Sequence, residues 1–354
     1  MITDHELVIL SEDIPAENLK AGDVGSVVRA HPDKDSFDVE FFSPDGETTR
    51  IVTLPAGHLA LHEEPRRDPT PAARGLGAGA MRVEANGITV HYELTGPEEA
   101  PVVLLCHSLA ATMNMWDAQM GSLTQRYGVL RYDLRGHGAT DATSGPYTFD
   151  MLADDALALL DVLGIHSCHF VGLSIGAMIG QALALRKAQP LVSLTLCATS
   201  SHTAPEAQPI WDDRINTAQT QGIPALAPAT LDRWLSQEFQ QRAPAETQRI
   251  RRMIEATPVD GFVGCAHAIR NLNFTERLKD IGLPTLILVG KNDPGTPVTA
   301  SEAIQREIKG ATMVVLDHAM HLCNIEQSQV FNDSLRAFLD KLEPGSFLRW
   351  SLTV

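Results

Sequence analysis

The sequence has too few basic residues for a protein that binds nucleic acid. It contains 28 Lys and Arg against 44 Asp and Glu, a formal net charge of −16. Binding to phosphate backbones needs a local excess of positive charge, so this composition argues against that function. No stretch approaches the roughly 20 apolar residues that span a membrane. The N-terminus is acidic where a secretory signal is basic, so we expect a cytoplasmic protein without membrane contact.

Cysteine is also scarce, and its spacing suggests neither zinc nor disulfides. The chain has no CxxC pair and no Cys/His cluster, whereas zinc sites need closely spaced ligands. We therefore expect no metal and no organic cofactor, and we expect the thiols to be reduced in the core. The five cysteines are Cys106, Cys168, Cys197, Cys265 and Cys323.

Composition divides the chain into two domains. Residues 63–80 are rich in Pro, Gly, Ala and Arg and lack apolar periodicity, which is typical of a linker. Residues 1–62 contain short β-branched and aromatic runs, with Asp-Gly at 45–46 as a hairpin signal, and predict a small five-stranded barrel. Residues 81–343 form the large domain, and residues 344–354 form a tail.

The N-terminal module is similar to a family of SH3-like domains. The resemblance rests on the pattern L-K-x-G-x-x-G-x-V, which runs from Leu19 to Val27. It implies a structural appendage or a protein-binding role, including contact between copies in a homo-oligomer. It implies no chemistry.

Strands and helices alternate along the large domain. Apolar runs such as PVVLLCH, CHFVGL and PTLILVG read as buried strands, and apolar residues recur at helical spacing over 150–164. This alternation predicts an α/β fold, with a mostly parallel sheet covered by helices on both faces. Residues from about 205 to 276 read as helices without strands and predict a helical cap. We interpret the acidic pair Asp154-Asp155 as a solvated helix face.

One motif carries nucleophilic chemistry. GLSIG (172–176) is a G-x-S-x-G sequence between a predicted strand and an Ala/Gly-rich helix. In that context the serine sits on a sharp, strained turn, and the two glycines remove clashes with the adjoining elements. The following helix N-terminus favours developing negative charge. We therefore identify Ser174 as the candidate nucleophile.

A serine hydroxyl needs a base, and in this arrangement an acid and then a histidine follow it in the chain. Asp293 comes just after the run PTLILVG, whereas TSSHT, after the run LVSLTLCA, holds no carboxylate. Two histidines, His318 and His321, follow the last predicted strand. His321 lies farther into the loop, where it can turn back over Ser174, but geometry alone leaves both open.

From Met81 to Leu342 the sequence resembles α/β-hydrolases, and among them 3-oxoadipate enol-lactonases. The resemblance runs through RYDLRGHGATD (131–141), HFVGLSIGAMIGQALA, the cap segments RWLSQEF and GFVGCAHAIRNLNF, and the ending HLCNIEQ. In that ending the family's catalytic histidine precedes Leu, which selects His321. The resemblance also implies two backbone N–H donors for the oxyanion, at Leu109 and Ile175.

The resemblance therefore implies a Ser-His-Asp hydrolase of small esters or lactones, most closely a carboxylated enol-lactone of aromatic catabolism. Candidate substrate contacts are Ser108, Trp116, Trp234 and Arg270. The alternative for the two tryptophans is packing in the core or the cap, and the alternative for Arg270 is a salt-bridged position at the surface. A carboxylate entering this acidic chain needs local positive charge, so we expect at least one cap arginine, Arg270 first, to face the pocket. The arginines of the predicted cap are Arg214, Arg233, Arg242, Arg249, Arg251, Arg252 and Arg270.

Other functions stay open. A carboxylesterase of different substrate range would use the same residues, because a fold does not fix a function. A haloalkane dehalogenase is disfavoured, since position 174 holds Ser rather than Asp. A non-catalytic binding protein would be expected to lack a triad member. Arg135 and His137, in the run RGHG, are expected to brace their loop.

Overall fold

The computed structural model separates into two compact units, Met1–Pro71 and Ala72–Val354. Each unit has its own hydrophobic core. The predicted tail 344–354, the Asp-Gly signal at 45–46 and all but the last two residues of the predicted linker 63–80 lie outside the described residues. The structure describes residues 7–15, 19–20, 23–31, 35–42, 49–61 and 79–343.

The N-terminal unit is a five-stranded antiparallel sheet. Val8 and Leu10 of its first strand are buried, as are Val39 and Phe41 of its third, because alternate side chains of a strand point to the same face. The coarse prediction of a small β-module is confirmed, and the SH3-like barrel stays a prediction. The strands pair in the order β4-β3-β2-β1-β5: β1 (Leu7–Leu10), β2 (Val24–Ala30), β3 (Ser36–Phe42), β4 (Thr49–Pro55) and β5 (Leu59–Leu61).

The large unit is built on a mostly parallel sheet, which confirms the predicted α/β architecture. β7 runs antiparallel to both of its neighbours, β6 and β9. β10 and β12 are buried along their whole length, as expected for strands covered on both faces. The order is β13-β12-β11-β10-β8-β9-β7-β6: β6 (Met81–Ala85), β7 (Ile88–Thr95), β8 (Val102–Cys106), β9 (Gly128–Tyr132), β10 (Cys168–Leu173), β11 (Leu191–Cys197), β12 (Thr285–Gly290) and β13 (Thr312–Leu316).

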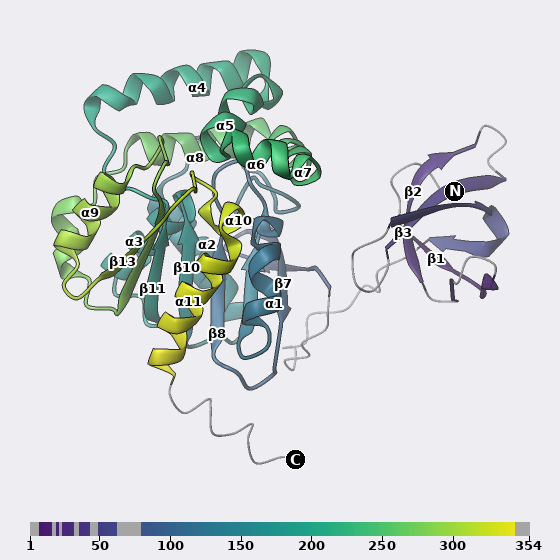
Figure 1. Ribbon diagram of the computed structural model, residues 1–354, viewed down its shortest axis with the longest axis horizontal. Coiled ribbons are helices and arrows are strands. Elements are labelled where there is room, and N and C mark those ends of the chain that lie inside the picture. The colour runs from purple at the N-terminus through teal and green to yellow at the C-terminus, as the bar shows by residue number, and fades with distance from the viewer. Residues whose placement is uncertain are drawn as a thin grey trace. The chain divides into compact units, whose positions relative to one another are not determined.

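Helices cover both faces of this sheet, and a second group of helices caps one end of it (Figure 1). The sheet helices are α1 (Asp117–Leu123), α2 (Phe149–Val162), α3 (Ile175–Leu185), α9 (Val298–Glu307), α10 (Cys323–Glu326) and α11 (Ser328–Leu342). The capping helices are α4 (Gln208–Gln221), α5 (Ala227–Trp234), α6 (Gln237–Arg242), α7 (Pro244–Glu255) and α8 (Val259–Arg270). Short 3₁₀ turns are η2 (Ala56–His58), η3 (Met113–Trp116), η4 (Pro205–Ala207), η5 (Ile223–Ala225) and η6 (Thr275–Asp280).

All five cysteines are buried and free. Burial raises the pKa of Cys106, and that of Cys168, to about 12, because a thiolate is poorly solvated in an apolar core. These side chains therefore act as small apolar groups. In the part of the chain that the structure describes, no helix is long and apolar enough to cross a membrane.

The interpretation of Asp154-Asp155 as a solvated face is wrong for the second residue. The Asp155 side chain is only 4% exposed and forms two hydrogen bonds, of 2.8 and 2.5 Å, with the Arg135 guanidinium. Asp155 lies on the same face of α2 as Leu152 and Leu159, which are both buried. The helical spacing therefore indicated that Asp155 is buried too. Asp154 pairs with Arg186 at the surface. The expectation that Arg135 braces its loop agrees with this contact.

We predict that Asp155→Ala lowers the free energy of unfolding by about 3–5 kcal/mol, because it leaves the buried Arg135 charge without its carboxylate partner. Asp154→Ala is the matched control in the same helix. Its loss is expected to be about 0–1 kcal/mol, as for exposed pairs. Urea unfolding of both variants measures the difference, and equal losses would contradict the assignment of Asp155 to the core.

Candidate active site

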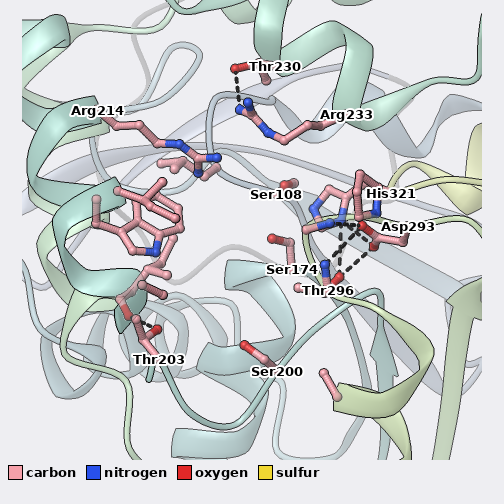
Figure 2. A pocket seen from close by; sticks show the side chains of 18 of the residues that line it. Ser108, Ser174, Ser200, Thr203, Arg214, Thr230, Arg233, Asp293, Thr296 and His321 are labelled. Carbon is pink, nitrogen blue, oxygen red and sulfur yellow. Dashed lines mark hydrogen bonds and ion pairs between the residues drawn. The ribbon is translucent and has the colours of Figure 1, made fainter. Parts of the chain in front are cut away.

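Four loops at the carboxyl ends of parallel strands meet beneath the capping helices. They follow β8, β10, β12 and β13 and carry Leu109, Ser174, Asp293 and His321, which all line one cavity of about 530 Å³ (Figure 2). Parallel strands bring their carboxyl ends to the same edge of a sheet, where open α/β sheets bind ligands. Residues more than 200 positions apart in sequence thus face the same space.

Ser174 has an unusual backbone conformation, with φ 57° and ψ −117°, between β10 and α3. A non-glycine residue with positive φ is strained. The turn is also tight: a Cβ on Gly172 would lie 2.4 Å from the Gly176 carbonyl, and one on Gly176 would lie 2.2 Å from Cys106 O. Both glycines are therefore required by close backbone contact, which supports the strained turn that the motif predicts.

Asp293 and His321 form a short, buried hydrogen bond. His321 Nδ1 lies 2.7 Å from Asp293 Oδ2, and the Asp293 side chain is fully buried. Oδ1 of Asp293 accepts the N–H groups of Gly295 and Thr296, while the Thr296 hydroxyl donates to Oδ2. Burial acts to raise the pKa of Asp293, but the charge of His321 and these hydrogen bonds outweigh it and lower the pKa. The carboxylate thus stays ionised and fixes the imidazole ring.

The two histidines of the last loop have different surroundings. His318 is exposed, with a left-handed φ of 57°, and does not line the cavity. His321 is buried, and its ring stacks on Trp234 of α5, with ring centroids 6.2 Å apart. The next residue, Leu322, donates its N–H to the Trp234 carbonyl. The loop of His321 is therefore attached to the capping helices as well as to Asp293.

Two backbone N–H groups near Ser174 are free to bind an anion. Leu109 lies in the loop after β8, and Ile175 is the first residue of α3. Within the described ranges neither N–H donates a hydrogen bond. Ser174 Oγ and His321 are not joined by a hydrogen bond either, a contact that in many enzymes tightens only when substrate binds. The arrangement can support attack on a carbonyl carbon by Ser174.

Two buried histidines hold the loop that contains Leu109. Ala110 N–H donates to His137 Nε2 at 3.1 Å, and Leu134 N–H donates to His107 Nε2 at 2.9 Å. A ring nitrogen that accepts a backbone N–H must be unprotonated, so both rings are neutral. Burial is the main cause that lowers the pKa of His137 to about 3, and burial also lowers the pKa of His107. The bracing role expected of His137 thus has a defined contact.

Two arginines of the capping helices reach the cavity wall. Arg214 of α4 and Arg233 of α5 approach each other above Ser174 and His321 (Figure 2). Arg214 lies over the Trp211 ring at 4.6 Å and Arg233 donates to the hydroxyl of Thr230, and among the described residues neither guanidinium has a carboxylate partner. Burial and the charge of Arg233 lower the pKa of Arg214 to about 10. The cavity therefore holds two partly desolvated cations.

Two of the four predicted substrate contacts do not line the cavity. Arg270 does not line the cavity and makes two hydrogen bonds with Asp212 on α4. Trp116 is fully buried and packs on Phe331. Ser108 and Trp234 do line the cavity. The arginine-rich composition of the cap correctly predicted that an arginine would line the cavity. Which arginines do so depends on how the helices pack in the tertiary structure, and these are Arg214 and Arg233.

In the described ranges no cluster of three His, Cys, Asp or Glu could hold a metal.

Comparison with known proteins agrees with this geometry. Residues 101–328 match the alpha/beta hydrolase fold family, and residues 5–61 match a domain of unknown function, DUF4926. The chain is 31% identical over 263 residues to 3-oxoadipate enol-lactonase 1 of Acinetobacter baylyi, an alignment that covers 74% of this chain and 97% of that protein.

Two solved structures are similar over the same region. The enol-lactonase from Burkholderia xenovorans LB400 superposes with a TM-score of 0.71 at 34% identity, covering 73% of this chain and 99% of that one. A thermophilic esterase from Thermogutta terrifontis superposes with a TM-score of 0.70 at 28% identity, covering 75% and 99%. Both similarities leave about a quarter of this chain unmatched.

Because His107 and His137 are neutral in the folded protein, we predict that the free energy of unfolding decreases in acid. An unfolded histidine gains a proton below about pH 6.5, whereas folded His137 gains one only near pH 3. The unfolded state therefore binds more protons between these values, and stability falls as pH decreases, by up to about 1.4 kcal/mol per pH unit for this group. His137→Gln should flatten the dependence of the unfolding free energy on pH between about 4 and 6. Parallel curves for both proteins would contradict the neutral ring.

Proposed function

The chain belongs to the α/β-hydrolase fold family, and on that premise we propose that it is a serine hydrolase of a small ester or lactone. Ser174 is the nucleophile, His321 the base and Asp293 the acid. The observation that carries the proposal is the 2.7 Å hydrogen bond between His321 Nδ1 and Asp293 Oδ2 in the cavity that Ser174 lines. It leaves His321 Nε2 available to accept a proton from the serine.

The reaction follows from these positions. His321 accepts the Ser174 hydroxyl proton as Oγ attacks the substrate carbonyl, and ionised Asp293 stabilises the imidazolium that forms. The free N–H groups of Leu109 and Ile175 donate to the oxyanion. His321 then protonates the leaving oxygen, which in a lactone stays attached to the acyl chain. Water, activated by His321, releases the acid and restores Ser174.

We propose a carboxylated enol-lactone as the substrate. Among the described residues neither Arg214 nor Arg233 has a carboxylate partner, and both are partly desolvated. A substrate carboxylate would stabilise both charges in the cavity. An enol-lactone suits the chemistry of the triad, because its enolate leaving group is stabilised and depends less on protonation by His321. The relative from A. baylyi, named as a 3-oxoadipate enol-lactonase, points the same way.

A carboxylesterase is the second candidate, favoured by the similarity to the thermophilic esterase. It would share the serine chemistry but would not require a substrate carboxylate. A non-catalytic binding protein is disfavoured, because a buried hydrogen bond between Asp293 and His321 serves to activate a nucleophile and a binding protein does not need one.

We also propose that the protein acts in the cytoplasm and that its N-terminal unit is an SH3-like barrel. The support for the first point is the free, buried state of all five cysteines. The second rests on the five antiparallel strands. The barrel would serve as an appendage or as a contact with protein, including a second copy of this chain.

Ser174→Ala and His321→Ala should each lower kcat by about 10⁶-fold, because the members of a triad act as a unit. His318→Ala is the matched control, since it removes an exposed histidine three residues away, and it should retain most activity. Steady-state hydrolysis of p-nitrophenyl butyrate measures all three. The proposal fails if Ser174→Ala keeps wild-type turnover or if the two histidine variants rank in the reverse order.

Arg214→Gln and Arg233→Gln should each raise KM for mono-p-nitrophenyl succinate about 10- to 100-fold, the range expected for a lost charge-assisted hydrogen bond. Neutral p-nitrophenyl butyrate, of similar length, should be hydrolysed almost as before. Arg270→Gln is the control and should affect neither substrate. Equal losses on both esters would make the two arginines structural and would favour the carboxylesterase.

A further inference from the structure

One hydroxyl in the catalytic cavity has no partner. Ser108 is only 1% exposed, and its Oγ makes no hydrogen bond among the described residues. Several other buried polar atoms lack a partner too, but of those in the described part of the chain only Ser108 Oγ belongs to a residue that lines the cavity (Figure 2). A buried hydroxyl without a partner destabilises a fold. Its place in a substrate cavity indicates that a ligand atom supplies the missing contact.

The backbone of Ser108 is fixed by three hydrogen bonds. Its N–H donates to Met115 Sδ at 3.3 Å, and its carbonyl accepts Nδ1–H of His107 at 2.7 Å and the N–H of Ala111 at 3.2 Å. The hydroxyl is thus the one polar group of this residue that is left unused. These contacts hold the backbone that carries the hydroxyl in place beside the cavity.

Ser108 directly precedes Leu109, whose N–H is also free. Both groups belong to the loop after β8, and Ser108, Leu109 and Ser174 line the same cavity. A hydroxyl can rotate to donate toward a neighbouring oxygen atom. Its bond to a developing anion is stronger than its bond to a neutral carbonyl, so it acts mainly in the transition state.

We propose that Ser108 Oγ donates a third hydrogen bond to the oxyanion, beside the N–H groups of Leu109 and Ile175. The inference rests on the proposed serine mechanism. As Ser174 Oγ bonds to the carbonyl carbon, the C=O π electrons move to oxygen and the serine proton passes to His321. Ser108 keeps its own proton throughout and donates a hydrogen bond that strengthens as the negative charge grows.

Ser108→Ala tests this role, and Ser301→Ala is its matched control. Ser301 on α9 is also fully buried with an unpartnered hydroxyl, but it does not line the cavity. Each variant removes one unsatisfied hydroxyl, so neither should lower the melting temperature of the full-length protein. Ser108→Ala should lower kcat for p-nitrophenyl butyrate about 10- to 100-fold, at or below the loss typical of one oxyanion donor, while Ser301→Ala leaves kcat unchanged.

Inhibition by phenylboronic acid separates transition-state binding from ground-state binding. Ser174 Oγ adds to boron as its proton passes to His321, and one boronate oxygen takes the position of the oxyanion. The inhibition constant should rise in Ser108→Ala by about the factor by which kcat falls, with KM nearly constant. A changed KM with unchanged boronate affinity would overturn the proposal and assign Ser108 to ground-state binding, and unchanged kinetics would also overturn it. Wild-type protein that hydrolyses esters but ignores the boronate would instead refute the serine mechanism itself.

Discussion

The strained backbone of Ser174 is the constraint on which the rest of the site depends. With φ 57° and ψ −117°, the residue needs neighbours that hold the turn and leave it room. Gly172 and Gly176 leave the room, since a Cβ on either would overlap backbone atoms. The Ser174 N–H donates to Cys197 O, and its carbonyl accepts the hydroxyl of Thr199. Strand β11 therefore helps to hold a conformation that costs of order 1–3 kcal/mol.

A second set of contacts, all polar and buried, orders the loops around that turn. Asp133 accepts hydrogen bonds from two backbone N–H groups and from a histidine, and neutral His107 and His137 accept two more. The ion pair of Arg135 with Asp155 anchors the same region to α2. Because His107 and His137 accept these hydrogen bonds only as neutral rings, we expect acid to weaken the contacts that hold the loop after β8.

Local sequence determined much of the candidate site, and tertiary packing determined the rest. The G-x-S-x-G turn, and an acid just after a buried strand, are local features, and Ser174, Asp293 and His321 do line one cavity. The choice between His318 and His321 needed a family pattern, because the spacing of the two histidines in the sequence does not determine the path of the loop. Whether Arg270 or Arg214 faces the cavity depends on how each cap helix is rotated against its neighbours, which composition does not fix. The burial of Asp155, by contrast, could have been predicted from its helical spacing, because it lies on the same face as Leu152 and Leu159. Its acidic side chain led to the opposite interpretation.

The central claim is that His321 and Asp293 make Ser174 a nucleophile. A fluorophosphonate that reacts with activated serines tests it most directly, with intact-mass and peptide analysis of the adduct. We predict one adduct per chain on the peptide that contains Ser174, formed far more slowly in His321→Ala than in His318→Ala. An adduct at another residue, or ester hydrolysis that survives the absence of any adduct, would contradict the account.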